Sequence, residues 1–264
     1  MMDILHYSFF QNALLGSLLA AIVCGIVGTY IVTRRLVFIS GGITHASFGG
    51  IGLGVLLGVN PVFSAMIFAV LSAFGVEWMA RRNVREDSAI AVFWTFGMSV
   101  GIICCFLTPG FMPDLPSFLF GSILTIGSLD LWLLAVLCVI VAACITVFYR
   151  EILSVAFDRT FAESQGLPVR WIEYGMMALV ALTIVSTLRM VGIVLAISLL
   201  TIPQMTANLF TCHFKRMMLL SIGFGWIDCL LGLSLSYLLN VPSGATIIFV
   251  SILVFGISKL LAKQ

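Results

Sequence analysis

Long apolar stretches separated by short polar junctions make up most of the chain. Nine of these stretches have about the 20 residues that a helix needs to cross a membrane. They lie at 10–32, 36–58, 61–80, 89–109, 129–149, 171–188, 190–209, 217–239 and 244–261. A membrane β-barrel strand would alternate polar and apolar residues over about ten positions, whereas these runs are apolar on every side. We therefore predict an all-α, polytopic membrane protein with nine transmembrane helices, or eight if the first or last run does not cross.

Nothing between the runs is long enough for a soluble domain, so residues 1–264 are predicted to form a single transmembrane domain. The run at 118–126, FLFGSILTI, is too short to span and is predicted to be re-entrant or interfacial. The N-terminal segment MMDILHYSFF has no basic region, and we expect no cleaved signal peptide.

Composition agrees with this class. Hydrophobic residues make up 61% of the chain and charged residues only 9%, against about 25% charged in a soluble domain. This excludes a water-soluble enzyme or a nucleic-acid-binding protein. All but one of the 13 Lys and Arg fall at alternate junctions, and the exception is Arg189. Basic residues mark the cytoplasmic side, so we expect the N-terminus outside and the C-terminus in the cytoplasm.

The second run, LVFISGGITHASFGGIGLGVLLG, combines a histidine with many glycines. On a helix, Gly41, His45, Gly49 and Gly52 fall on one narrow face, which leaves room beside the imidazole for an ion or a partner helix. Imidazole is a good ligand for divalent transition metals, although a hydrogen-bonded structural histidine fits the same pattern. Glycines 54 and 58 have the spacing of close helix contacts.

The main acidic residues inside predicted spans are Glu77, Glu173 and Asp228. Asp228 is near the middle of its span, where a carboxylate costs about 2.5–3.5 kcal/mol. It should therefore face an ion, water or a structural partner such as Trp226, Ser234 or a neighbouring backbone donor. Glu77 is predicted to pair with Arg81 one turn later. Glu173 is predicted to stabilise the start of its helix, where the positive end of the macrodipole attracts a carboxylate.

Two local patterns concern helix ends. Pro203 cannot donate a hydrogen bond to the Leu199 carbonyl, so a kink or a freed acceptor is expected, beside a polar stripe of Thr201, Gln204 and Asn208. The cytoplasmic loop 157–168, FDRTFAESQGLP, predicts a short helix, a glycine stop and a proline start for the next span. Such a helix could dock in a groove of another protein. The chain contains no G-x-x-x-x-G-K-[ST] motif for nucleotide binding.

Six sequence blocks together resemble the permease subunits of bacterial ABC importers for zinc, manganese and iron. SGGITHASFGG is similar to the family pattern G-D-A-[LI]-S-H-A-x-L-P-G, and the other blocks follow in the family's order. These are REDSAIAVFWTFGMSVGI, FLFGSIL, FDRTFAESQGLPV, VGIVLAISLLTIPQMTANLF and LSLSYLLNVPSGATIIFVS. The family's aspartate four residues before the histidine falls at Gly41 in this chain, and its proline falls at Gly49.

The resemblance implies a homodimeric permease in the bacterial cytoplasmic membrane. It implies two partners: an ABC ATPase subunit, and an extracytoplasmic metal-binding protein that delivers the cation. It also implies that His45 faces the translocation path and that the loop carrying Phe161, Ala162, Glu163 and Gly166 couples to the ATPase. We hypothesise that Asp228 supplies the carboxylate that Gly41 lacks. No catalytic residue, cofactor or high-affinity metal site is expected, since a transported cation must be released.

Three other functions stay open at this point. A permease for a metal chelate such as a siderophore or cobalamin would have a longer chain and about ten spans. An ATPase-independent secondary transporter would show inverted repeats. An intramembrane hydrolase could use Ser40 or Ser47 with His45, but the chain offers no third orienting group and no G-x-S-x-G motif.

Overall fold

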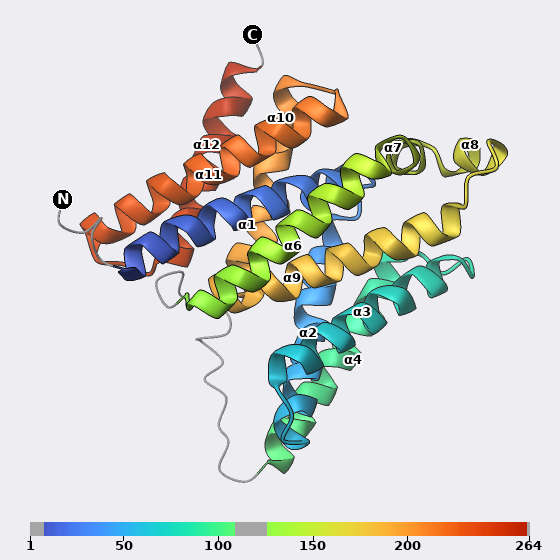
Figure 1. Cartoon of the computed structure of the whole chain (residues 1–264), viewed down its shortest axis with the longest axis horizontal. Coiled ribbons are helices and arrows are strands. Elements are labelled where there is room, and N and C mark those ends of the chain that lie inside the picture. Colours follow the sequence, from blue (N-terminus) through green and yellow to red (C-terminus); the bar gives the residue numbers. More distant parts are fainter. Residues whose placement is uncertain (1–7, 109–125, 263–264) are drawn as a thin grey trace. The chain divides into compact units, whose positions relative to one another are not determined.

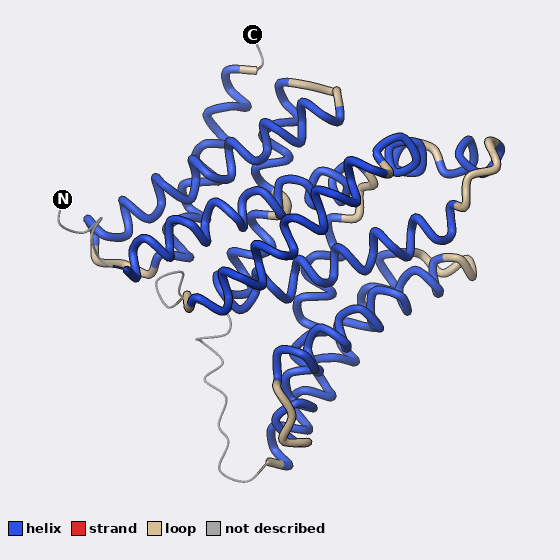
Figure 2. Tube along the Cα trace, viewed as in Figure 1, coloured by secondary structure: helices blue, strands red, loops and turns tan. Residues whose placement is uncertain are grey.

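The computed structural model describes residues 8–108 and 126–262, and these form helices joined by short connections, with no strand among them (Figure 2). The helices, labelled in Figure 1, are α1 (Ser8–Thr33), α2 (Val37–Leu56), α3 (Pro61–Ala80), α4 (Glu86–Leu107), α6 (Ser128–Val147), α7 (Tyr149–Phe157), α8 (Arg159–Ser164), α9 (Val169–Leu199), α10 (Ile202–Phe210), α11 (Phe214–Leu239) and α12 (Ser243–Leu261). The prediction of an all-α protein is confirmed. The short run at 118–126 lies outside the described residues except for Ile126.

Nine segments of the described chain are long and apolar enough to cross a membrane. They reproduce the nine predicted spans to within a few residues. The sixth, Val169–Leu188, lies within the long helix α9. The seventh, Val191–Phe210, consists of the last part of α9 and the short helix α10. Gly192 interrupts α9 with a φ of 79° and a ψ of 171°, a conformation that glycine adopts readily because it has no Cβ.

The helices fall into two compact units. The first unit contains α1, α6, α10, α11, α12 and the part of α9 from Ser186 onward. The second unit contains α2, α3, α4, α7, α8 and the part of α9 up to Val185. Each of the two units is described below by itself.

In the second unit, α2 packs against both α3 and α4, and the three helices lie side by side in Figure 1. Glycines allow the close approach: a Cβ at Gly50 would lie 2.6 Å from the Cα of Ala65 in α3, and one at Gly54 would lie 2.8 Å from the Cα of Pro61. The predicted contact through Gly54 is therefore present. Gly58 is not part of it, because α2 ends at Leu56 and Gly58 takes a φ of 66° in the following turn.

In the first unit, Pro203 breaks the chain between two helices and does not kink one continuous helix. Helix α9 ends at Leu199, and Pro203 lies in the first turn of α10, where its missing N–H costs nothing. The freed Leu199 carbonyl accepts a hydrogen bond from Nε2 of Gln204 at 3.0 Å. The same Nε2 donates to the Cys24 carbonyl of α1 at 2.7 Å. The wholly buried Gln204 amide thus joins α1 to the helix break.

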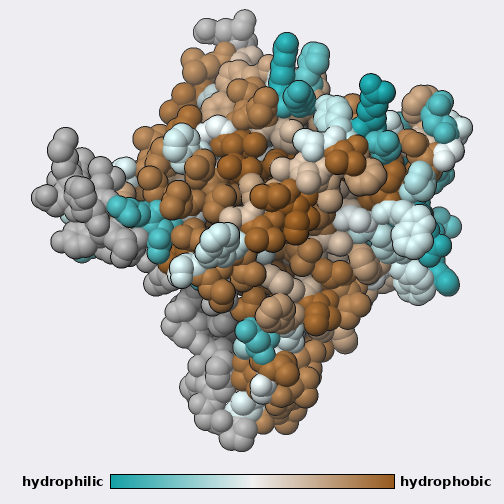
Figure 3. All heavy atoms as spheres, in the orientation of Figure 1, coloured by the Kyte–Doolittle hydropathy of each residue, from teal (hydrophilic) through white to brown (hydrophobic). Residues whose placement is uncertain are grey.

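Apolar side chains cover the outside of the helices, as the brown spheres of Figure 3 show for the visible face. On α3, Phe63, Ile67 and Leu71 form one outward stripe, and each is more than 60% exposed. Exposed apolar stripes of this kind are unfavourable in water and match the hydrocarbon of a bilayer. The surface therefore agrees with a membrane-embedded chain.

The Gln204 contacts predict a stability loss for Gln204→Leu, which keeps the side-chain volume and removes the donor. Two buried carbonyls would each lose a partner, at about 1–3 kcal/mol per group. We expect a lower midpoint of thermal unfolding in detergent. The control is Asn208→Leu, one turn along the same stripe and exposed, which should leave the midpoint unchanged. An unaltered midpoint for Gln204→Leu would contradict this role.

Candidate functional site

The His45 imidazole lies in the second unit, half-buried on α2, with its ring against Trp94 of α4. The two rings are parallel within 5°, and their centroids are 4.5 Å apart. This stacked arrangement covers one face of the imidazole and restricts its rotation about the Cβ–Cγ bond.

The stack follows from the close packing of α2 and α4. A Cβ at Gly49 would lie 2.7 Å from the Gly97 carbonyl oxygen, and a Cβ at Gly52 would lie 2.7 Å from the Gly101 carbonyl oxygen. The predicted small-residue face therefore meets a partner helix over Gly49 and Gly52. Gly41, one turn before His45, is only half-buried.

Neither serine near His45 is arranged as a nucleophile. The Ser40 hydroxyl donates to the Val37 carbonyl at 2.7 Å, and the Ser47 hydroxyl donates to the Thr44 carbonyl at 2.6 Å. Both side chains are fully buried, and their protons satisfy the backbone of their own helix. The intramembrane hydrolase therefore finds no support in the geometry.

Asp228 lies in the first unit, on α11, and is 1% exposed. Helices α11 and α12 approach closely at Gly232 because this residue has no side chain. A Cβ there would lie 2.5 Å from the Cα of Ile247. The Asp228 carboxyl meets Ser251 of α12, and its Oδ1 atom has no hydrogen-bond partner.

Two side chains that the sequence suggested as partners of Asp228, those of Trp226 and Ser234, were wrong. Ser234 donates to the Leu230 carbonyl at 2.8 Å, and the Trp226 side chain is 37% exposed on a different face of α11. Ser251 comes from the next helix, and no local pattern could have indicated it. His45 belongs to the second unit and Asp228 to the first.

The short helix predicted in the loop 157–168 is confirmed. Asp158 caps α8 by accepting a hydrogen bond from the Phe161 N–H at 3.0 Å. After α8, Gly166 takes a φ of 74°, and α9 begins directly after Pro168. Asp, Gly and Pro thus set the limits of the helix as their local preferences predict.

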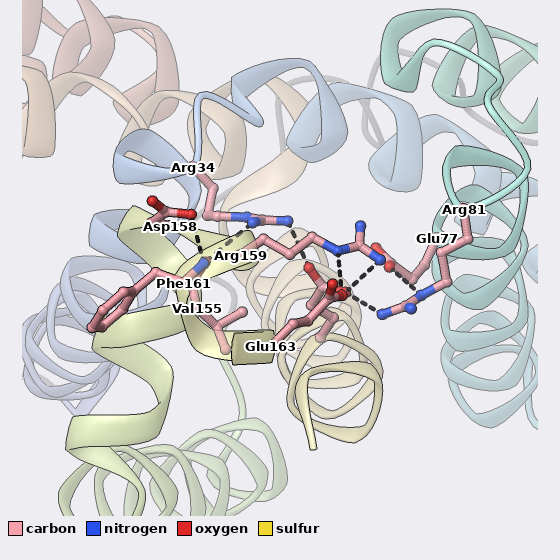
Figure 4. Close-up of polar contacts among 9 residues, drawn as sticks. Arg34, Glu77, Arg81, Val155, Asp158, Arg159, Phe161 and Glu163 are labelled. Carbon is pink, nitrogen blue, oxygen red and sulfur yellow. Dashed lines mark hydrogen bonds and ion pairs between the residues drawn. The ribbon is translucent and has the colours of Figure 1, made fainter. Parts of the chain in front are cut away.

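The two faces of α8 differ strongly. Ala162 is fully buried against Val155 of α7 and Val169 of α9, whereas Phe161 and Glu163 are 55% and 54% exposed. Figure 4 shows the Phe161 ring pointing away from the cluster of arginines. An exposed aromatic ring on a short, capped surface helix is suited to fill a pocket in another protein.

Beside α8, a cluster of charged side chains surrounds the buried carboxylate of Glu173. Figure 4 shows Arg34, Arg81 and Arg159 of this cluster. Nη2 of Arg34 lies 3.0 Å from Glu173 Oε1, Arg81 bonds to Oε2, and Nη2 of Arg159 lies 3.7 Å from Oε2. The predicted pair of Glu77 and Arg81 is confirmed, with Nε 2.8 Å from Oε1.

The sequence interpretation of Glu173 as a residue that favours the helix start was wrong. Helix α9 begins at Val169, so Glu173 lies beyond the first turn, where the macrodipole has little effect. Its oxygens bind guanidinium groups from three other segments. The same cluster raises the pKa of Arg159: burial disfavours the charge, but the carboxylates of Glu173, Glu163 and Glu77 outweigh it.

Within the described residues, no three His, Cys, Asp or Glu side chains are grouped so that they could hold a metal ion. The two metal ligands predicted from the sequence, the His45 imidazole on α2 and the Asp228 carboxyl on α11, are therefore single donors and not parts of a described metal cluster.

Comparisons with known proteins give matches over nearly the whole chain. The model of the ABC 3 transport family matches residues 6–262. An uncharacterized membrane protein of Synechocystis is 41% identical over 98% of this chain and 92% of its own length. The manganese transport system membrane protein MntC of Listeria monocytogenes is 33% identical over 99% of this chain and 93% of its own length.

A solved structure agrees with these sequence matches. The structure described as PsaBC from Streptococcus pneumoniae in complex with Fab contains a chain that superposes with a TM-score of 0.86 and 30% identity. The match covers 97% of this chain and 93% of that chain. The likeness thus extends over both units.

The packing that brings Trp94 to His45 predicts that Gly97→Ala is destabilising. The added methyl group would lie 2.5 Å from the Cα of Ala46 on α2 and would force the helices apart, at about 1–3 kcal/mol. We expect a lower unfolding midpoint in detergent. Gly175→Ala is the control, because its Cβ meets nothing within 4 Å, and it should unfold at or above the wild-type temperature. Equal midpoints for the two variants would refute the close approach.

Proposed function

The chain belongs to the ABC 3 transport family and is the permease subunit of an ABC importer for a divalent transition metal, and we propose that this metal is manganese. The resemblance noted in the sequence is thereby confirmed, as is the prediction of a transport subunit. The observation that carries the choice of metal is the 33% identity to a manganese transport system membrane protein over 99% of this chain. The protein is accordingly a multi-pass membrane permease of a bacterial importer.

For the translocation path, the proposal assigns a role to His45. Its imidazole is half-buried and not enclosed, and the glycine at position 41 leaves bare backbone one turn away. A single imidazole with no second strong ligand binds a cation weakly. Weak binding suits transport, because a fully coordinated ion would not be released.

Asp228 is proposed as a separate ligand in the path, apart from His45, and takes the place of the family aspartate that falls at Gly41. The support is its Oδ1 atom, which is buried and has no hydrogen-bond partner. Carboxylate oxygens are ligands that manganese prefers. Because Asp228 is buried against α12, it becomes available to the ion when α11 and α12 separate.

For the coupling to ATP, the proposal assigns the ATPase contact to the loop that carries Phe161, Ala162, Glu163 and Gly166. Phe161 and Glu163 point outward for docking, Ala162 anchors α8 to α7 and α9, and Gly166 ends the helix. ATP binding on the separate ATPase subunits displaces α8, and the spans respond by alternating access.

The remaining parts of the proposal concern assembly and orientation. Two copies of the chain, each acting as one permease domain, pair in the bacterial cytoplasmic membrane. An extracytoplasmic binding protein delivers the metal to them. The N-terminus lies outside and the C-terminus in the cytoplasm, supported by the concentration of Lys and Arg at alternate junctions.

His45→Ala is expected to lower the initial rate of manganese uptake at least tenfold, because the path loses its imidazole. The measurement is uptake of radioactive manganese by cells that express the complete importer, with zinc as a competitor. His213→Ala, an exposed histidine before α11, is the matched control and should transport normally. Normal uptake by His45→Ala would remove it from the path. Uptake of a siderophore or cobalamin instead of the free metal would overturn the proposal that manganese is the cargo.

Asp228→Asn is expected to lower manganese uptake several-fold, since the amide keeps the size of the side chain and loses the charge that attracts the cation. The double variant Gly41→Asp with Asp228→Asn should regain uptake, because the carboxylate returns one turn from His45. Uptake and permease abundance in the membrane are measured together for both variants. Wild-type uptake by Asp228→Asn alone would disprove a role for this carboxylate.

A further inference from the structure

The carboxylate of Glu173 is the common partner of charged groups from three other segments of the second unit. Its side chain is fully buried, and both of its oxygens are engaged. Arg34 precedes α2, Arg81 follows α3, and Arg159 is the first residue of α8. A buried carboxylate is stable only when such partners neutralise it, and removal of one partner leaves an uncompensated charge.

The partners of Glu173 connect further. Nη1 of Arg34 donates to the Val155 carbonyl of α7 at 3.2 Å, so this guanidinium joins α7 and α9 to the start of α2. Nε of Arg159 donates to Glu163 at 3.2 Å. Each of these segments therefore reaches Glu173 through one or two hydrogen bonds or ion pairs.

The three arginines around Glu173 differ in how much of each side chain is exposed. The Arg34 and Arg81 side chains are 13% and 20% exposed, whereas Arg159 is 35% exposed and makes the longest contact, 3.7 Å. Arg34 and Arg81 thus form an inner pair, and Arg159 is the outer contact that belongs to α8. Salt bridges of buried groups are geometrically well defined, in contrast to exposed pairs.

We propose that Glu173 is a positioning residue that links α8 to the start of α2 and the end of α3, so that a displacement of α8 moves the helix that carries His45. This inference rests on the proposed function, because it takes α8 as the contact that the ATPase displaces. Apolar packing of Ala162 holds α8 to α7 and α9, and α7 reaches Arg34 through the Val155 carbonyl. The charged cluster connects α8 through Glu173 to Arg81 as well.

The test uses the complete importer in proteoliposomes, with manganese uptake and ATP hydrolysis measured on the same preparation. Glu173→Gln keeps the shape of the side chain and removes its charge. We expect ATP hydrolysis within about twofold of wild type and manganese transported per ATP reduced at least tenfold. Asp87→Asn, which breaks the exposed pair with Arg85, should leave this ratio unchanged. An unchanged ratio in folded Glu173→Gln overturns the proposal.

Arg159→Gln keeps the test decisive if Glu173→Gln does not fold. It removes the outer contact together with the exposed Arg159 pair to Glu163, and Glu173 stays paired with Arg34 and Arg81. The ratio of manganese to ATP should fall about threefold, and a wild-type ratio overturns the proposal.

A second readout needs no cargo and so separates this proposal from the choice of metal. Spin labels at Ser164 on α8 and Phe38 on α2, both exposed, report the distance between the two helices, with the exposed Cys212 replaced by serine. On addition of a non-hydrolysable ATP analogue, the distance should stay fixed in the otherwise wild-type importer and change in Glu173→Gln. The same response in both overturns the linkage, whether or not manganese is the cargo.

Discussion

Water is absent from the middle of a bilayer, so every polar group there must find its partner within the protein. The described spans meet this constraint in two ways, and the buried Oδ1 atom of Asp228 is an exception. Hydroxyl groups such as those of Thr29 and Ser221 donate to carbonyls four residues earlier in their own helices. Where a helix is broken, a side chain from elsewhere supplies the missing donor, as Gln204 does for the Leu199 carbonyl. The same requirement gathers three arginines around Glu173.

Much of the fold follows from local properties of the sequence. The length and apolar character of the runs predicted nine spans, because the bilayer sets one length for all of them. The limits of α8 were also predictable, since Asp158, Gly166 and Pro168 act on the backbone within a few residues of their own positions. The pair of Glu77 and Arg81 needed only the spacing of one helical turn.

The site depends on contacts that no local pattern contains. Arg34 and Arg81 lie 139 and 92 positions from Glu173, and their meeting is decided by how the helices of the second unit pack. For the same reason the glycines on α2 indicated a partner helix, but not that Gly97 and Trp94 of α4 would face them. The polar stripe around Pro203 gave the correct residue, Gln204, while its second acceptor on α1 required the structure.

The stack between His45 and Trp94 has a consequence for the way an ion meets the imidazole. The nitrogen lone pair lies in the plane of the ring, so an indole on its face leaves the coordinating edge open while it prevents the ring from swinging. An imidazole held in this way offers its electrons in one fixed direction. In the translocation path proposed for His45, the ring could not turn to follow a cation that moves onward, so each step of the ion would weaken the bond and speed its departure.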